Sequence, residues 1–145
     1  MWFYKGQQIQ ELADMPEKTF GFVYEITHQP TGRKYIGRKQ LISVTRKALG
    51  KKELALQTDK RLSKKKTVTK ETDWKKYYGS HPEIKQMIKD GKELEFTREI
   101  LIFALTKKQL TYYEDKYLYM NGVIEPGSIY FNDNVTGRFF KKDLL

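Results

Sequence analysis

The stretch GFVYEITHQPTGRKYIGRK, residues 21–39, constrains the fold more than any other part of the chain, because it predicts a β-hairpin. In its first seven residues large apolar side chains alternate in the two-residue period of a strand. Its middle, HQPTG, contains a proline that fixes φ and a glycine that permits a positive φ. A second strand follows directly. The hairpin therefore brings Tyr24 and Tyr35 side by side, with Gly37 just beyond the second tyrosine.

Two short motifs in this hairpin resemble the paired signature of the GIY-YIG nucleases, metal-dependent enzymes that cleave phosphodiester bonds. The first motif ends FVY at Tyr24, and YIG begins at Tyr35 after ten intervening residues. Phe22 stands where the family name has glycine, although Gly21 precedes it by one position. The resemblance covers roughly residues 19–133 and implies an α+β fold, with a small three-stranded antiparallel sheet flanked by helices.

The charge of the chain is concentrated in one segment. The net charge is +10, and residues 38–76 hold 14 lysines and arginines against 4 acidic residues, whereas the rest of the chain holds 14 of each. Such a concentration favours a polyanionic partner. The chain has no cysteine, which excludes disulfides and thiolate metal sites. Because it lacks a signal-peptide pattern and an apolar run of about 18 residues, we expect a protein of the cytoplasm with no membrane partner.

We expect a single domain over residues 1–145. It divides into an aromatic N-terminal β leader at 1–18, the signature hairpin at 19–37, a basic insertion at 38–76 and the remainder at 77–145. Within the insertion, residues 41–49 are weakly helical in pattern. Residues 50–70 have few large apolar side chains, which predicts a mobile arm that orders against phosphates. The alternative is a flexible insertion without a role.

The remainder of the chain predicts two helices and two strands. Ser80 and Thr106 each begin a capping box, and the second helix runs to about Met120. The apolar pattern predicts one strand over residues 94–103 and a closing strand over 128–132. With the hairpin and a first aromatic turn at residues 74–78, the expected order is β-β-α-α-β-α-β.

Glu114 is the most informative residue of the second helix. It lies four residues after Leu110 and four before Leu118, so it points with the apolar stripe of the helix. A carboxylate in that place needs a metal ion or a cation as its partner. A salt bridge to Arg98 or Arg38 is the alternative to a metal site.

The resemblance implies an active site assembled from several elements. It assigns catalytic roles to Tyr24, Tyr35, Arg38, Tyr77 and Asn132, and assigns to Glu114 one divalent cation, Mg²⁺ or Mn²⁺. The position at which the family has its catalytic arginine is occupied by Asp73 in this sequence. A carboxylate cannot replace the positive charge of an arginine. Arg38 and then Arg46 are the candidates to replace it. Tyr24, with its pKa lowered by the metal and Arg38, is expected either to act as general base or to orient the water, and Tyr35 to position that water; the sequence leaves open which tyrosine takes the proton.

The implied function is a metal-dependent DNA endonuclease, homing-type or phage-encoded, acting on double-stranded DNA in the cytoplasm of a bacterial host. A homo-oligomer is one way for such an enzyme to cut both strands. A module of the same fold that binds DNA without cutting it is the second hypothesis, and an interaction protein that uses the aromatic leader is the third. The lysines expected to contact DNA are Lys39, Lys47, Lys51, Lys52, Lys64, Lys65, Lys66, Lys75 and Lys76.

Overall fold

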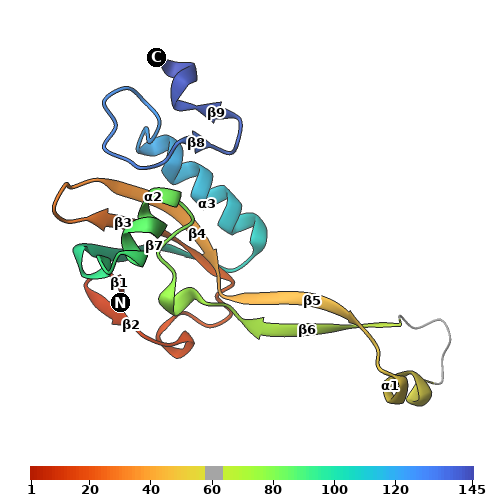
Figure 1. Cartoon of the computed structure of the whole chain (residues 1–145). Coiled ribbons are helices and arrows are strands. Elements are labelled where there is room, and N and C mark those ends of the chain that lie inside the picture. Colours follow the sequence, from red (N-terminus) through yellow and green to blue (C-terminus); the bar gives the residue numbers. More distant parts are fainter. Residues whose placement is uncertain (58–63) are drawn as a thin grey trace. The chain divides into compact units, whose positions relative to one another are not determined.

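The computed structural model describes residues 1–57 and 64–145 of the chain, which forms two compact units. The first unit comprises residues 1–41 and 73–145 and is called the body here. The second comprises residues 42–72, within the predicted basic insertion, and is called the ribbon unit (Figure 1). Among the described residues, no helix is long and apolar enough to cross a membrane.

The body is built on a mixed sheet of five strands in the order β2-β1-β7-β3-β4. The strands are β1 (Trp2–Tyr4), β2 (Gln7–Ile9), β3 (Gly21–His28), β4 (Lys34–Gln40) and β7 (Phe96–Ala104). Neighbours β4, β3 and β7 are antiparallel, as predicted, whereas β1 pairs with β7 in parallel. The prediction of three strands was wrong in number. The leader adds the two strands β1 and β2. The side chain of Trp2 is 1% exposed, and its burial in the core holds β1 against β7, with which it pairs.

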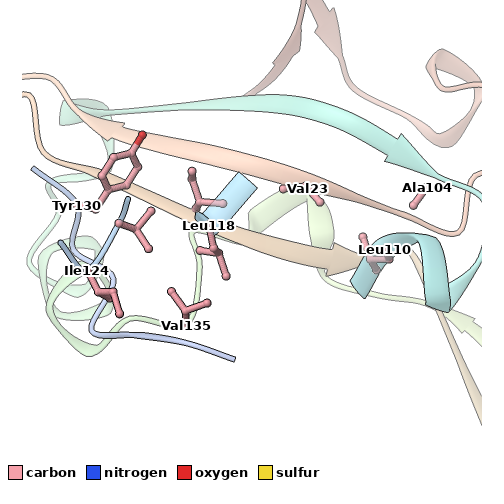
Figure 2. Packing of buried hydrophobic residues seen from close by; sticks show 9 residues of the cluster. Val23, Ala104, Leu110, Leu118, Ile124, Tyr130 and Val135 are labelled. Atoms are coloured by element: carbon pink, nitrogen blue, oxygen red, sulfur yellow. The ribbon is translucent and has the colours of Figure 1, made fainter. Parts of the chain in front are cut away.

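Strand β3 is a central strand of the sheet, and side chains of the body pack on both of its faces. Val23 on one face packs with Ile36, Leu110 and Leu118, and Figure 2 shows several members of this apolar cluster. Aromatic rings cover the other face, where Trp2 and Trp74 contact Phe22 edge-on. Burial on both faces explains why the first four residues of β3, GFVY, carry no charged side chain and are all buried.

Two helices and four short 3₁₀ turns complete the body. The helices are α2 (Pro82–Lys89) and α3 (Lys107–Met120), and the turns are η1 (Leu12–Asp14), η2 (Trp74–Lys76), η3 (Glu93–Glu95) and η4 (Lys141–Leu144). The Thr106 side chain accepts a hydrogen bond from the amide of Gln109, which confirms the predicted cap of α3. The predicted cap of α2 at Ser80 was wrong, since His81 is the N-cap and accepts from the amide of Glu83.

The predicted closing strand at residues 128–132 was also wrong. Only Tyr130 forms a bridge, in parallel with Lys34 of β4. Beyond Tyr130, the side chain of Asn132 pairs with the backbone of β4 in place of a further strand. Its Oδ1 accepts a hydrogen bond from the amide of Ile36 at 3.1 Å, and its Nδ2 donates one to the carbonyl of Ile36 at 2.8 Å. The chain then forms a small hairpin of β8 (Asn134–Val135) and β9 (Phe139–Phe140).

The ribbon unit corrects two further predictions. Residues 41–49 are not helical, because β5 (Ile42–Ala48) pairs with β6 (Lys65–Glu71) as an antiparallel ribbon. The predicted mobile arm contains β6 and a short helix, α1 (Lys51–Leu56), while residues 58–63 of that arm lie outside the described residues. β-Branched side chains in β5 favour a strand, but its partner lies too far along the chain for a local pattern to reveal the pairing.

Candidate active site

The signature hairpin places the two tyrosines on one face of the sheet. Tyr24 of β3 lies directly opposite Gly37 of β4, and Tyr35 precedes that glycine by two residues. The two rings are 6.3 Å apart between centroids. A Cβ atom on Gly37 would lie 2.4 Å from the Tyr24 hydroxyl and 3.1 Å from the Tyr35 ring. The glycine of the motif therefore leaves the space into which both tyrosines pack.

The surroundings of the tyrosines oppose their ionisation. Burial raises the pKa of Tyr24 well above its usual value, and Tyr77, Tyr35 and Glu114 add to the effect. Burial also raises the pKa of Tyr35, against a hydrogen bond with Ser80 at 3.1 Å that lowers it. The groups of the protein thus push the pKa of Tyr24 in the direction opposite to the one predicted for a general base.

A cavity of about 540 Å³ lies along the edge strand β4, where Tyr35 from this face and Ile36 and Arg38 from the opposite face line it. Tyr35 lines it, whereas the buried Tyr24 does not. Residues from β4, α3, the start of α2 and the segment after Phe131 contribute to its wall. The polar side chains among them are Tyr35, Arg38, Ser80, His81, Thr111, Glu114, Asp115, Asn132, Asp133, Asn134 and Thr136.

Arg38 and Glu114 face each other in this cavity. The Nε of Arg38 lies 3.7 Å from Oε1 of Glu114, and its Nη1 donates to the hydroxyl of Thr111 at 2.5 Å. Burial raises the pKa of Glu114, and the positive charge of Arg38 acts against that rise. The other expected partner, Arg98, is buried between the rings of Trp2 and Tyr78 instead. Arg38 is therefore the cation that the fold brings to Glu114.

The donor set of the cavity suits a hard divalent cation held by few protein ligands. Among residues 1–57 and 64–145, no group of three or more His, Asp and Glu side chains is arranged as a metal cage. The side chain of Glu114 is 22% exposed, and its ion pair with Arg38 is long. Mg²⁺ commonly binds one or two carboxylates and keeps water and phosphate oxygens as its other ligands. Glu114 fits that mode.

The sequence reasoning missed a second pair of polar side chains in the cavity, His81 and Asp133. The Nε2 of His81 lies 2.9 Å from a carboxylate oxygen of Asp133, and its Nδ1 accepts from the amide of Glu83 at 3.2 Å. Because Nδ1 is an acceptor, Nε2 carries the ring proton and donates a hydrogen bond to the carboxylate of Asp133. The available signal was a histidine directly before the first proline of α2. The prediction of Ser80 as the cap of α2 gives this histidine no role.

A family model described as "Putative endonuclease segE, GIY-YIG domain" matches residues 2–135 of the 145-residue chain. The chain belongs to the GIY-YIG endonuclease family. No curated protein and no solved structure matches it. The matched range spans the leader strands and the ribbon unit.

The remaining predicted site residues of this GIY-YIG domain lie in several environments. The Tyr77 ring packs edge-on against Tyr24, 5.9 Å between centroids, and outside the cavity wall. Asn132 lines the cavity while its amide is paired with β4. Lys39 forms an ion pair with Asp73, whose carboxylate oxygen lies 2.6 Å from its Nζ.

The other predicted cations divide between the two units. Arg46 lies in strand β5 of the ribbon unit, opposite Thr67, and its catalytic role stays a prediction. Lys75 and Lys76 are exposed in turn η2 of the body. The remaining predicted DNA-contacting lysines belong to the ribbon unit; they are Lys47, Lys51, Lys52, Lys64, Lys65 and Lys66.

Proposed function

We propose that this GIY-YIG domain hydrolyses phosphodiester bonds of double-stranded DNA with the help of Mg²⁺ or Mn²⁺. The observation that supports this most directly is the facing pair of Arg38 and Glu114 on the wall of a polar cavity. Phosphoryl transfer requires charge stabilisation and positioning more than covalent chemistry. A guanidinium and a carboxylate beside one another supply a phosphate contact and a cation ligand.

In this mechanism Arg38 binds the non-bridging oxygens of the scissile phosphate and stabilises the charge that develops there. Glu114 would hold a divalent cation, and the chemistry that such a cation would supply is polarisation of the phosphate and stabilisation of the leaving oxygen. The Tyr35 hydroxyl, which lines the cavity, orients the attacking water. Tyr24 supports Tyr35 by packing against it, and its raised pKa disfavours a role as general base.

The pair of His81 and Asp133 serves as a positioning element in this proposal. Both nitrogens of the neutral imidazole are engaged, one by Asp133 and one by the amide of Glu83. The imidazole therefore links the start of α2 to the segment that follows Asn132. This link fixes the wall of the cavity opposite Glu114.

The proposal extends to the biological setting. The net charge of +10 suits a DNA substrate, and we assign the enzyme to the homing-type or phage-encoded endonucleases acting in the cytoplasm of a bacterial host. A homo-oligomer would place two cavities on one duplex and so cut both strands.

A binding module that does not cleave is the second candidate. Two points favour it: Asp73, which forms an ion pair with Lys39, stands where the resemblance leads us to expect the catalytic arginine, and burial raises the pKa of Tyr24. The charge of the chain would then serve binding alone.

Cleavage of supercoiled plasmid separates the two candidates. We expect the wild type to nick plasmid with Mg²⁺ or Mn²⁺ and to be inactive with EDTA. Glu114→Ala should lower the cleavage rate about 10³-fold or more while duplex binding is retained, because the metal contributes several kcal/mol to the transition state. Glu99→Ala, which removes an exposed carboxylate of β7, is the matched control and should cleave normally. A wild type that cuts nothing with either metal but still shifts DNA in a salt-sensitive manner would identify a binding module.

A further inference from the structure

The ribbon unit presents an accessible surface that the cavity chemistry does not use. Strands β5 and β6 form consecutive cross-strand pairs from Ile42–Glu71 to Ala48–Lys65 without a register shift (Figure 1). No side chain of either strand is buried. A two-stranded hairpin without a covered apolar face is marginally stable in water. The ribbon therefore has little core of its own, and a partner that covers it would stabilise it.

The charge of the ribbon unit points to a polyanion as that partner. Residues 42–72 hold ten lysines and arginines against three acidic residues. Lys47 lies directly opposite Lys66, and like charges in that arrangement destabilise a sheet. Glu53 of α1 contacts Lys66 at 2.5 Å, so an internal carboxylate offsets part of this repulsion. An external row of phosphates would relieve the rest.

The composition of the unit distinguishes among polyanions. Proteins that bind single strands stack the bases on aromatic side chains, and residues 42–72 contain no Phe, Tyr or Trp. Double-stranded RNA has a major groove too deep and narrow for side chains to read. The major groove of B-DNA is about 12 Å wide and admits a two-stranded ribbon, whereas the minor groove is about 6 Å wide. Strands about 4.8 Å apart with side chains on both sides match the wider groove.

We propose that the β5–β6 ribbon inserts into the major groove of duplex DNA, an inference that rests on the proposed DNA substrate. Alternation along the strands places Ser43, Thr45 and Lys47 on one face with Lys70, Val68 and Lys66. This face holds hydroxyls and a valine between lysines, and it enters the groove. Hydroxyls and methyl groups contact base edges, and lysines contact guanine or phosphate. The opposite face carries two cations, Arg46 and Lys65, but it also carries Glu71 and three apolar side chains, those of Ile42, Val44 and Ala48. With an acid and fewer cations, it suits a phosphate-lined groove less well.

Dimethyl sulfate probing of a short mixed-sequence duplex in EDTA tests the groove assignment, because this reagent methylates guanine N7 in the major groove and adenine N3 in the minor groove. We expect the full-length wild type to protect guanine N7. Lys47→Gln combined with Lys66→Gln should remove that protection. The same variant should reduce the slope of log affinity against log salt by about 1.8, since each phosphate contact contributes about 0.9.

Two matched variants control for charge and for folding. Lys85→Gln with Lys89→Gln removes the same charge from the exposed side of α2 and should leave both the N7 protection and the salt slope unchanged. Lys47→Arg with Lys66→Arg keeps the charge and should keep both readouts near the wild-type values. If α2 variants weaken protection as much as ribbon variants, the proposal is wrong.

The remaining outcomes separate this inference from the proposed function. Protection of adenine N3 alone, unchanged N7 reactivity on a saturated duplex, or tighter binding to a single strand of the same sequence would each overturn the ribbon proposal. Failure of the wild type to cleave plasmid, with N7 protection intact, would overturn the nuclease proposal and leave the ribbon in place. Cleavage of plasmid without N7 protection would overturn the ribbon proposal and leave the nuclease proposal in place.

Discussion

The surroundings of the cavity in the body and the ribbon unit differ in how they are built, and we propose a DNA contact for each. Around the cavity, Tyr24 is 1% exposed and Gly37 has no room for a methyl group. In the ribbon, Val44 is 56% exposed and no strand residue is buried. Chemistry on a phosphate requires side chains fixed to within a fraction of an ångström, and tight packing provides that. Contact with a charged polymer requires charge and reach, which an exposed ribbon provides without a core.

Truncation of a core residue should separate the two regions most strongly. Trp2→Ala removes a ring that contacts Phe22 and Tyr24, and it also removes the indole hydrogen bond to the carbonyl of Trp74. We expect a loss of about 3–5 kcal/mol in the free energy of unfolding. Val44→Ala in the ribbon should change it by less than about 0.5 kcal/mol. Urea unfolding measures both, and equal losses would mean that the ribbon is packed as the body is.

Removal of each candidate arginine should affect different steps. Arg38→Ala should lower the single-turnover cleavage rate about 10²- to 10³-fold, because it removes a donor to the developing phosphate charge. Arg46→Ala should leave that rate at saturating protein within about threefold of wild type and weaken binding instead. The two readouts are a quench time course and a salt titration of affinity. A rate loss confined to Arg46→Ala would move the catalytic arginine to the ribbon unit.

A methyl group added to a glycine should be costly in one region and neutral in the other. Gly37→Ala forces the Tyr24 hydroxyl or the Tyr35 ring to move, and we expect a loss of about 1–3 kcal/mol in stability together with slower cleavage. Gly50→Ala, before α1, meets no atom closer than 3.9 Å and should cost no more than about 0.5 kcal/mol. Thermal unfolding of both variants tests this. A tolerated Gly37→Ala would show that the tyrosine packing is looser than described.

The smallest effect concerns the acidity of Glu114. Because burial raises its pKa in the folded state, the folded protein holds this proton more tightly than the unfolded chain does. The carboxylate therefore costs stability as pH rises from the usual glutamate pKa through the raised value, and it keeps that cost above it. Glu114→Gln should stabilise the metal-free fold at neutral pH, and the gain should vanish below the usual pKa. Urea unfolding of the variant and the wild type in EDTA at several pH values measures the difference.

Much of the site was readable from local sequence. The spacing of the hairpin predicted that Tyr24 and Tyr35 lie on one face, and the four-residue spacing around Glu114 placed it on the buried stripe of α3. Both are short-range consequences of strand and helix periods. The cap of α3 at Thr106 was equally local. Contacts between distant segments were not readable in this way.

The sequence by itself determined the signature hairpin, the long helix with its carboxylate, the family resemblance and the concentration of charge between residues 38 and 76. The tertiary structure decided which cation meets Glu114, where Asn132 pairs, that His81 and Asp133 share the cavity, and that the basic segment forms a ribbon. The physical reason is separation along the chain. Periodicity and capping depend on neighbours within a few residues, whereas each of these contacts joins segments whose approach is set by burial of the core between them.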